Sequence, residues 1–145
     1  MDNIKLSIEQ DIWATTPGPT TKLTKAFHNA DHVILIFSVN ESRSFQGFAI
    51  MESEPDPNYK SELFVADSSS IQYSNNFKVK WIVTCDYPFT RLNHLPPNPM
   101  NENMPIKQSK NGQELPFKMG NYLCHLLYNF DDKSKKVIRP IENYC

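Results

Sequence analysis

The sequence has 145 residues, of which 39% are hydrophobic and 21% charged, and its formal net charge is -1. This is enough for one domain with one hydrophobic core. The charge argues against a protein that binds nucleic-acid backbones non-specifically, because such proteins need a broadly basic surface, but it leaves room for a small basic patch beside a pocket.

Three cysteines, Cys85, Cys124 and Cys145, are an odd number and no two are close in sequence. This spacing argues against a disulfide framework and against a zinc site with paired cysteines, so we expect a reducing compartment. No apolar stretch is long enough to span a membrane. The opening residues do not resemble a signal peptide, because acidic residues interrupt their apolar positions.

The first third of the chain predicts a helix followed by two strands. Residues 20–30 favour a helix, since their apolar side chains share one face. Residues 32–39 form a near-continuous run of branched apolar residues, which is typical of a buried strand. Residues 45–51 predict a second strand.

The next segment, residues 52–75, is polar, with two prolines and a serine triplet. It predicts a long loop, and long loops in compact domains are often functional. Three large apolar residues, Leu63, Phe64 and Tyr73, interrupt its polar character. They are candidates for a binding surface or for anchors that plug the core.

The remaining elements complete the predicted class. Residues 77–85 alternate, which predicts a strand with Trp81 on its core-facing side. Residues 94–107 are irregular and proline-rich, and residues 112–130 end in a second helix with an apolar stripe. Residues 131–145 predict a polar, peripheral tail. Helices around a mixed β-sheet give the class α+β, with a small barrel as its closed form.

The motifs of common enzyme chemistry are absent from the sequence. There is no G-x-S-x-G, H-E-x-x-H or Walker loop. Of the four histidines, His28 and His32 are four residues apart, but the predicted helix ends between them. We therefore predict no catalytic site, no metal and no cofactor.

Three stretches together resemble the YTH family: residues 12–27 continued by 33–51, residues 72–82, and residues 98–114. Their order and spacing are similar to the family over residues 2–128. The resemblance implies a barrel-like, curved sheet with helices packed around it (a YTH/PUA-like fold), in a domain of residues 1–130. Family members begin with a further strand ahead of the position of Met1, so we expect a truncated first strand.

The resemblance also implies a ligand, N6-methyladenosine in single-stranded RNA. The family holds the methylated base between three large apolar side chains, which fall here on Trp13, Phe64 and Tyr73. Position 64 departs from the pattern, because tryptophan is usual there, and Leu63 is the alternative alignment.

Polar contacts are implied by the same resemblance. Asn3 matches a residue that reads the adenine edge, and the Ala14 carbonyl, followed by Thr15, accepts the remaining N6 hydrogen. Basic and polar contacts to phosphates fall on Lys107, Lys110 and Asn111. A basic residue that touches RNA in some members is replaced by Asn40, for which Arg43 is a nearby substitute.

The similarity is greatest to nuclear members and to the YTH domain of the plant polyadenylation-factor zinc-finger subunit. It implies single-stranded RNA and the mRNA 3'-end processing machinery as partners, with no membrane. It also implies the nucleus as location, with the cytoplasm as the alternative.

Three other functions stay open on the residues alone. The domain could read another modified base, or be a protein-interaction module whose pocket has degenerated. An enzyme such as a demethylase would need an iron triad of two histidines and a carboxylate. The sequence leaves the flanking nucleotides and the oligomeric state undetermined.

Overall fold

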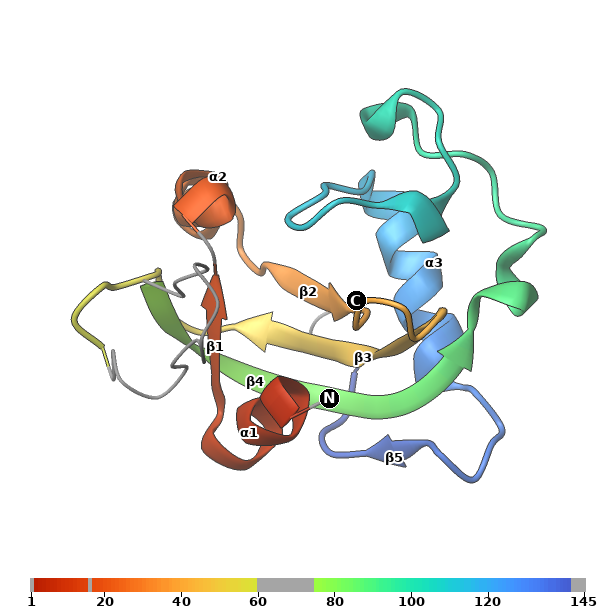
Figure 1. Cartoon of the computed structure of the whole chain (residues 1–145), viewed down its shortest axis with the longest axis horizontal. Coiled ribbons are helices and arrows are strands. Elements are labelled where there is room, and N and C mark those ends of the chain that lie inside the picture. The colour runs from red at the N-terminus through yellow and green to blue at the C-terminus, as the bar shows by residue number, and fades with distance from the viewer. Residues whose placement is uncertain (1, 16, 60–74, 142–145) are drawn as a thin grey trace. The chain divides into compact units, whose positions relative to one another are not determined.

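The computed structural model describes residues 2–15, 17–59 and 75–141, and the structural statements below concern these residues (Figure 1). The chain alternates short helices and strands in its first half and ends in a helix and a short strand. In chain order the elements are α1 (Asp2–Gln10), β1 (Ile12–Thr15), α2 (Pro17–Asn29), β2 (Ile34–Phe37), β3 (Ser44–Met51), β4 (Asn75–Pro88), η1 (Phe89–Leu92), η2 (Pro99–Asn101), η3 (Ile106–Gln108), α3 (Phe117–Tyr128) and β5 (Lys136–Val137).

The strands form a five-stranded antiparallel sheet in the order β1-β4-β3-β2, with β5 paired to β4. The class α+β is confirmed. Two details of the expectation were wrong: over the described residues the sheet is antiparallel rather than mixed, and it does not close into a barrel. The apolar run at 32–39 suggested a strand buried on both faces. In the structure Ile34, Leu35 and Ile36 are only half-buried, because β2 ends the sheet path and has one neighbouring strand.

The chain divides into two compact units. The first unit comprises Met1–Leu35 and Ile50–Trp81, and the second comprises Ile36–Ala49 and Ile82–Cys145. Strands β2, β3 and β4 each contribute residues to both units. We describe the packing of each unit by itself.

The core of the first unit is built between α1 and the first half of β4. Trp81 is fully buried, and its indole Nε1–H donates to Ser7 Oγ of α1 at 2.9 Å. Phe77 and Val79 are buried beside it, while Lys78 is exposed, so the predicted alternation and the core position of Trp81 are confirmed. This hydrogen bond satisfies the one polar group of a large buried ring.

A tight link places β1 against β4. Asp11, directly after α1, has φ 55°, a left-handed conformation that ends the helix and turns the chain. The Asp11 carbonyl accepts the Val79 N–H at 3.1 Å, and β1 then pairs antiparallel with β4, with Trp13 opposite Phe77. The register of β1 is therefore determined before the chain reaches Trp13.

The core of the second unit lies along β3, whose residues are all buried. Gly47 has φ 132°, and a Cβ at this position would lie 2.0 Å from the Val83 carbonyl oxygen, so only glycine fits. Helix α3 adds Leu123, Cys124 and Leu127, which confirms the predicted apolar stripe in its central part.

Part of the expected C-terminal tail belongs to this second unit. In β5, Val137 pairs with Val83 of β4, and the Ile138 N–H donates to the Ile82 carbonyl at 2.7 Å. Ile141 is buried. The division of the chain at residue 130 stays a prediction.

Candidate RNA interface

Trp13, the first predicted pocket wall, lies in the middle of β1. Its neighbours Ile12 and Ala14 are buried, whereas Trp13 is half-buried. The half-buried Trp13 thus lies between two buried residues of the same strand. The ring packs against this Ile12–Ala14 cluster, as do Leu6 and Tyr59. Part of a large aromatic side chain is therefore exposed on β1.

The two residues after Trp13 are buried. Ala14 is opposite Asn76 and Thr15 opposite Asn75 in the pairing with β4. Both residues are only 4% exposed.

Asn3 lies in α1, which packs against β1. The helix begins at Asp2, so Asn3 lies within its first turn. Its side chain is exposed.

The other two predicted walls, Phe64 and Tyr73, lie outside the described residues, as does the alternative Leu63. Their assignment stays a prediction.

Lys107, Lys110 and Asn111 belong to the second unit, where a compact turn holds all three exposed. Lys107 lies in η3 beside Ile106, which is 5% exposed and anchors the turn. The Ile106 carbonyl accepts both the N–H and the hydroxyl of Ser109, at 3.0 and 2.7 Å. The Lys110 carbonyl accepts the Gln113 N–H at 2.9 Å. The backbone is thus ordered, and the two ammonium groups face solvent.

Sequence reasoning missed a cavity in the first unit. We call it the loop pocket; its volume is about 560 Å³ and it is lined by Ser53, Glu54, Pro55, Asp56, Pro57, Tyr59 and Lys78. The Lys78 N–H donates to Ser53 Oγ at 2.8 Å, and the Asp56 N–H donates to the Asn76 carbonyl at 2.9 Å. The signal in the sequence was Tyr59, an aromatic residue directly after the turn-forming pair Pro57 and Asn58.

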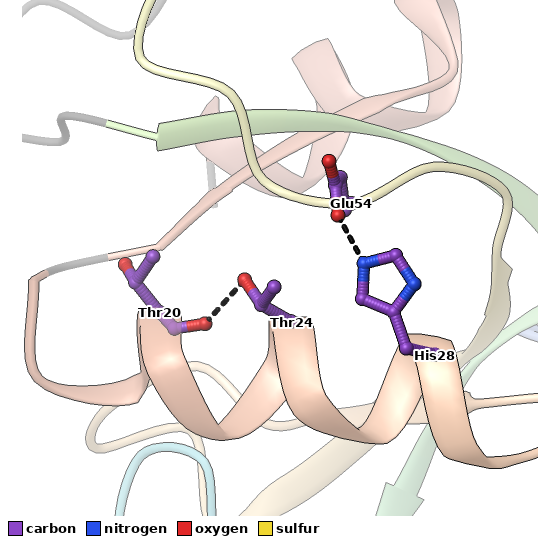
Figure 2. Close-up of polar contacts among 4 residues, drawn as sticks. All are labelled: Thr20, Thr24, His28 and Glu54. Atoms are coloured by element: carbon purple, nitrogen blue, oxygen red, sulfur yellow. Dashed lines mark hydrogen bonds and ion pairs between the residues drawn. The ribbon is translucent and has the colours of Figure 1, made fainter.

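Helix α2 holds the other side of this loop. His28 in the last turn of α2 pairs with the Glu54 carboxylate, as Figure 2 shows. One turn earlier Thr24 Oγ1 donates to the Thr20 carbonyl at 2.9 Å. Thr20 Oγ1 in turn accepts from the Asn75 side-chain amide at 3.1 Å, at the start of β4. One face of α2 therefore contacts both the loop and the strand that frame the pocket.

The described cysteines show no sign of activation. Cys85 and Cys124 are buried free thiols. Burial raises the pKa of Cys85 to about 12, so its thiol stays protonated at neutral pH, and the thiolate is the reactive form. Among the residues that the structure describes, none of the helices is long and apolar enough to cross a membrane.

Comparison with known proteins gives consistent matches over nearly the whole chain. The model of the YT521-B-like domain, YTH, matches residues 1–128. The 30-kDa cleavage and polyadenylation specificity factor 30 of Arabidopsis thaliana is 41% identical over 127 residues, which are 88% of this chain and 20% of that protein. YTH domain-containing protein 1 of Drosophila melanogaster is 37% identical over 97% of this chain and 19% of its own length. The chain thus spans about a fifth of these relatives.

Solved structures match equally well. The Toxoplasma CPSF4 YTH domain, in complex with a 7-mer m6A-modified RNA, has a TM-score of 0.78 and 38% identity, over 92% of this chain and 87% of that one. The YTH domain of the Zygosaccharomyces rouxii MRB1 protein, in complex with N6-methyladenosine RNA, has a TM-score of 0.75 and 28% identity, over 86% and 78%.

Proposed function

Because the chain belongs to the YTH family, we propose that it binds N6-methyladenosine in single-stranded RNA. The observation in this structure that carries the proposal is the half-buried ring of Trp13. It lies on β1, and the register of β1 is set by its pairing with β4. The likeness to the Toxoplasma domain, whose structure contains a methylated RNA, supports the same ligand.

The proposed pocket adds Phe64 and Tyr73 to Trp13 as walls. Aromatic faces stack on any base, with roughly 1–3 kcal/mol per base. Stacking alone does not separate methylated from plain adenine, so the methyl group must do so. Burial of one carbon contributes about 0.8 kcal/mol, and a methyl-sized void in the unmethylated complex costs about 1 kcal/mol more. Together they predict a preference of about twentyfold.

The edge contacts come from the residues around β1. In our proposal the Ala14 carbonyl accepts the single remaining N6 hydrogen, with Thr15 beside it, and Asn3 contacts the adenine ring. A dimethylated amine has no hydrogen to donate, so it would leave a buried acceptor unpaired. The base must leave its stack to enter such a pocket, which favours single strands.

The phosphate contacts are assigned to Lys107 and Lys110, with Asn111 as a polar neighbour. Lys107 lies in η3, Lys110 and Asn111 lie on the turn that follows it, and all three are exposed. Lysine contacts to phosphates add affinity without information about the base.

The proposal extends to the cellular role. The Arabidopsis relative is a cleavage and polyadenylation specificity factor. We propose that residues 1–130 act as a reader module without catalytic activity, in the nucleus, in a protein of mRNA 3'-end processing.

Titration of the purified chain with two labelled 7-mer RNAs, identical except for one N6-methyl group, tests this function. We expect tighter binding of the methylated strand by about twentyfold. Equal affinities would overturn the proposal and favour a module whose pocket has degenerated. A preference for a different modified base in the same assay would reassign the ligand.

A further inference from the structure

We propose that Asn98 is a positioning residue for RNA binding, which holds the two phosphate-contacting lysines in place without touching the strand itself. We call residues 99–113, which include Lys107 and Lys110, the lysine loop. The inference rests on the proposed function, because it needs phosphate contacts at these lysines. All of the residues concerned belong to the second unit.

The lysine loop has little hydrophobic anchorage. Of residues 99–113, all of which the structure describes, only Ile106 is buried. Met100 is 48% exposed and Met104 is 40% exposed. The helical turns within the loop, η2 and η3, have three residues each. Segments with few buried apolar contacts open easily, so the order of this loop depends on its hydrogen bonds.

Asn98, directly before the lysine loop, supplies hydrogen bonds at its start. It is 1% exposed, and its Oδ1 accepts the Met100 N–H at 2.9 Å, which caps η2. Its carbonyl accepts the N–H groups of Asn101 and Asn103 at 3.0 and 2.9 Å, and its own N–H donates to the Met104 carbonyl at 2.9 Å. One buried residue thus holds the first turn of the loop through its side chain, its carbonyl and its N–H.

That first turn contains two residues in an unfavourable conformation. Glu102 and Asn103 have φ 52° and 60°, left-handed values that are costly for residues with a Cβ. Two consecutive residues of this kind persist only where the surrounding structure holds them. Asn98 provides this support, since it bonds to the chain on both sides of the pair.

The same side chain also reaches the other end of the lysine loop. Asn98 Nδ2 donates to the Glu114 carbonyl at 2.9 Å, sixteen positions further along the chain. Gln113 adds an exposed link, in which Nε2 donates to the Met100 and Glu114 carbonyls at 3.2 Å each. Asn98 therefore closes the lysine loop into a ring whose two ends meet at one buried side chain.

An asparagine suits this position because of its amide. The buried side chain accepts one hydrogen bond from Met100 and donates another to Glu114, and an amide has an oxygen and an NH2 group for these two roles. An apolar residue would leave both main-chain groups without this partner. The buried polar residue is therefore specific to the closure of the loop.

The consequence for RNA binding is that the two charges are positioned in advance. A lysine whose backbone is already fixed loses less conformational freedom on contact with a phosphate than a lysine on a mobile loop. Trp13 lies in the first unit and is not part of this loop. Loss of the Asn98 bonds should therefore weaken binding of methylated and plain RNA by the same factor, because phosphate contacts carry no information about the base.

A double-mutant cycle between Asn98 and the lysines tests this role. Asn98→Ala is introduced into the unmodified chain and into the Lys107→Ala/Lys110→Ala chain, and both are titrated with methylated and plain 7-mer RNA over a salt series. In the unmodified chain we expect both affinities to fall on the order of tenfold at low salt, from the added cost of ordering two side chains. The slope against log salt should fall from about 1.4 towards zero, while the methyl preference stays at about twentyfold. In the chain without the lysines, Asn98→Ala should have no further effect on affinity, because the groups that it positions are absent.

Asn98→Ser separates positioning from folding, and it replaces Asn98→Ala in the cycle if the alanine variant unfolds. Serine keeps a capping oxygen for the Met100 N–H but has no second polar atom for the Glu114 carbonyl, so the loop opens at one end. Amide hydrogen exchange should become faster within the lysine loop and stay unchanged in α3, and RNA affinity should fall as in the alanine variant. Asn129→Ser, at an exposed asparagine of the same unit outside the loop, is the matched control and should change none of these quantities.

Three outcomes would overturn the inference. The first is a loss of affinity that is equal with and without the two lysines, which would indicate a general structural role. The second is faster exchange in the lysine loop of Asn98→Ser with unchanged RNA affinity and salt slope. The third is loss of the methyl preference in a folded Asn98 variant. A chain that binds RNA through the lysines but has no methyl preference would refute the proposed function alone, because the cycle can be measured with plain RNA.

Discussion

The two units of the molecule differ in charge, and in our proposal each unit has a different task in RNA binding. The first unit has six lysines against nine acidic residues, and it contains Trp13 and the loop pocket. The second has nine lysines and arginines against seven acidic residues, and it contains Lys107 and Lys110. Recognition of a base needs shape and a dry surface, whereas attraction of a phosphate needs exposed cations. A net charge of -1 is therefore compatible with an RNA-binding domain in which these tasks lie in different units.

Within the first unit, the two tryptophans differ in burial. Trp81 is fully buried and hydrogen-bonded to Ser7, and Trp13 is half-buried on β1. The buried ring of Trp81 stabilises the unit, and in our proposal the ring of Trp13 binds the ligand. Substitution of each in turn should give opposite phenotypes.

The largest effect is expected for Trp81→Ala. Loss of a fully buried tryptophan should lower the free energy of unfolding by about 3–5 kcal/mol. Denaturant unfolding followed by far-UV circular dichroism measures it. A loss below about 1 kcal/mol would show that Trp81 does not carry the core of this unit.

Trp13→Ala should leave the domain folded and remove the preference for methylated RNA, a loss of about twentyfold in the affinity ratio. The measurement is the paired titration, with circular dichroism as the check on folding. If Trp13→Ala instead unfolds the chain, Trp13 belongs to the core and its role in the pocket is wrong.

Asn3→Ala should weaken binding of methylated and plain RNA equally, on the order of tenfold for one lost buried hydrogen bond. Asn3 is exposed on α1, and alanine favours helices, so the fold should be unaffected. Unchanged affinity for both strands would remove Asn3 from the site.

Lys107→Ala and Lys110→Ala should have the smallest effect on affinity, and the effect should be confined to its dependence on salt. Each should reduce the slope of log affinity against log salt by about 0.7, the value for one phosphate contact on a single strand. Lys133→Ala, an exposed lysine of the same unit, serves as the control. A lysine variant that loses the methyl preference but keeps its salt slope would belong to the pocket.

Local patterns predicted most of the regular elements. The helix expected at 20–30 is α2 (Pro17–Asn29), the strand expected at 45–51 is β3 (Ser44–Met51), and the alternating strand at 77–85 is the core of β4 (Asn75–Pro88). In each case the periodicity of apolar residues is a local property of the chain, and burial follows it.

The features that the sequence did not predict depend on contacts between distant parts of the chain. Strand β1 has four residues, too few for a periodic signal, and it exists because β4 pairs with it. The edge position of β2 depends on which strands lie beside it, so its apolar run overstated its burial. The loop pocket combines residues about 20 positions apart, Lys78 with 53–59, and no local pattern relates them. The resemblance to a family, rather than any spacing, was the source of the assigned site residues.

The separation of tasks between the two units is tested most directly by one ratio. Affinities for methylated and plain RNA should be measured with the unmodified chain over a series of salt concentrations. Our account predicts that both affinities fall with a common slope of about 1.4, for two phosphate contacts, while their ratio stays at about twentyfold. A ratio that collapses towards one as salt rises would show that charge, and not the pocket at Trp13, distinguishes the methylated strand.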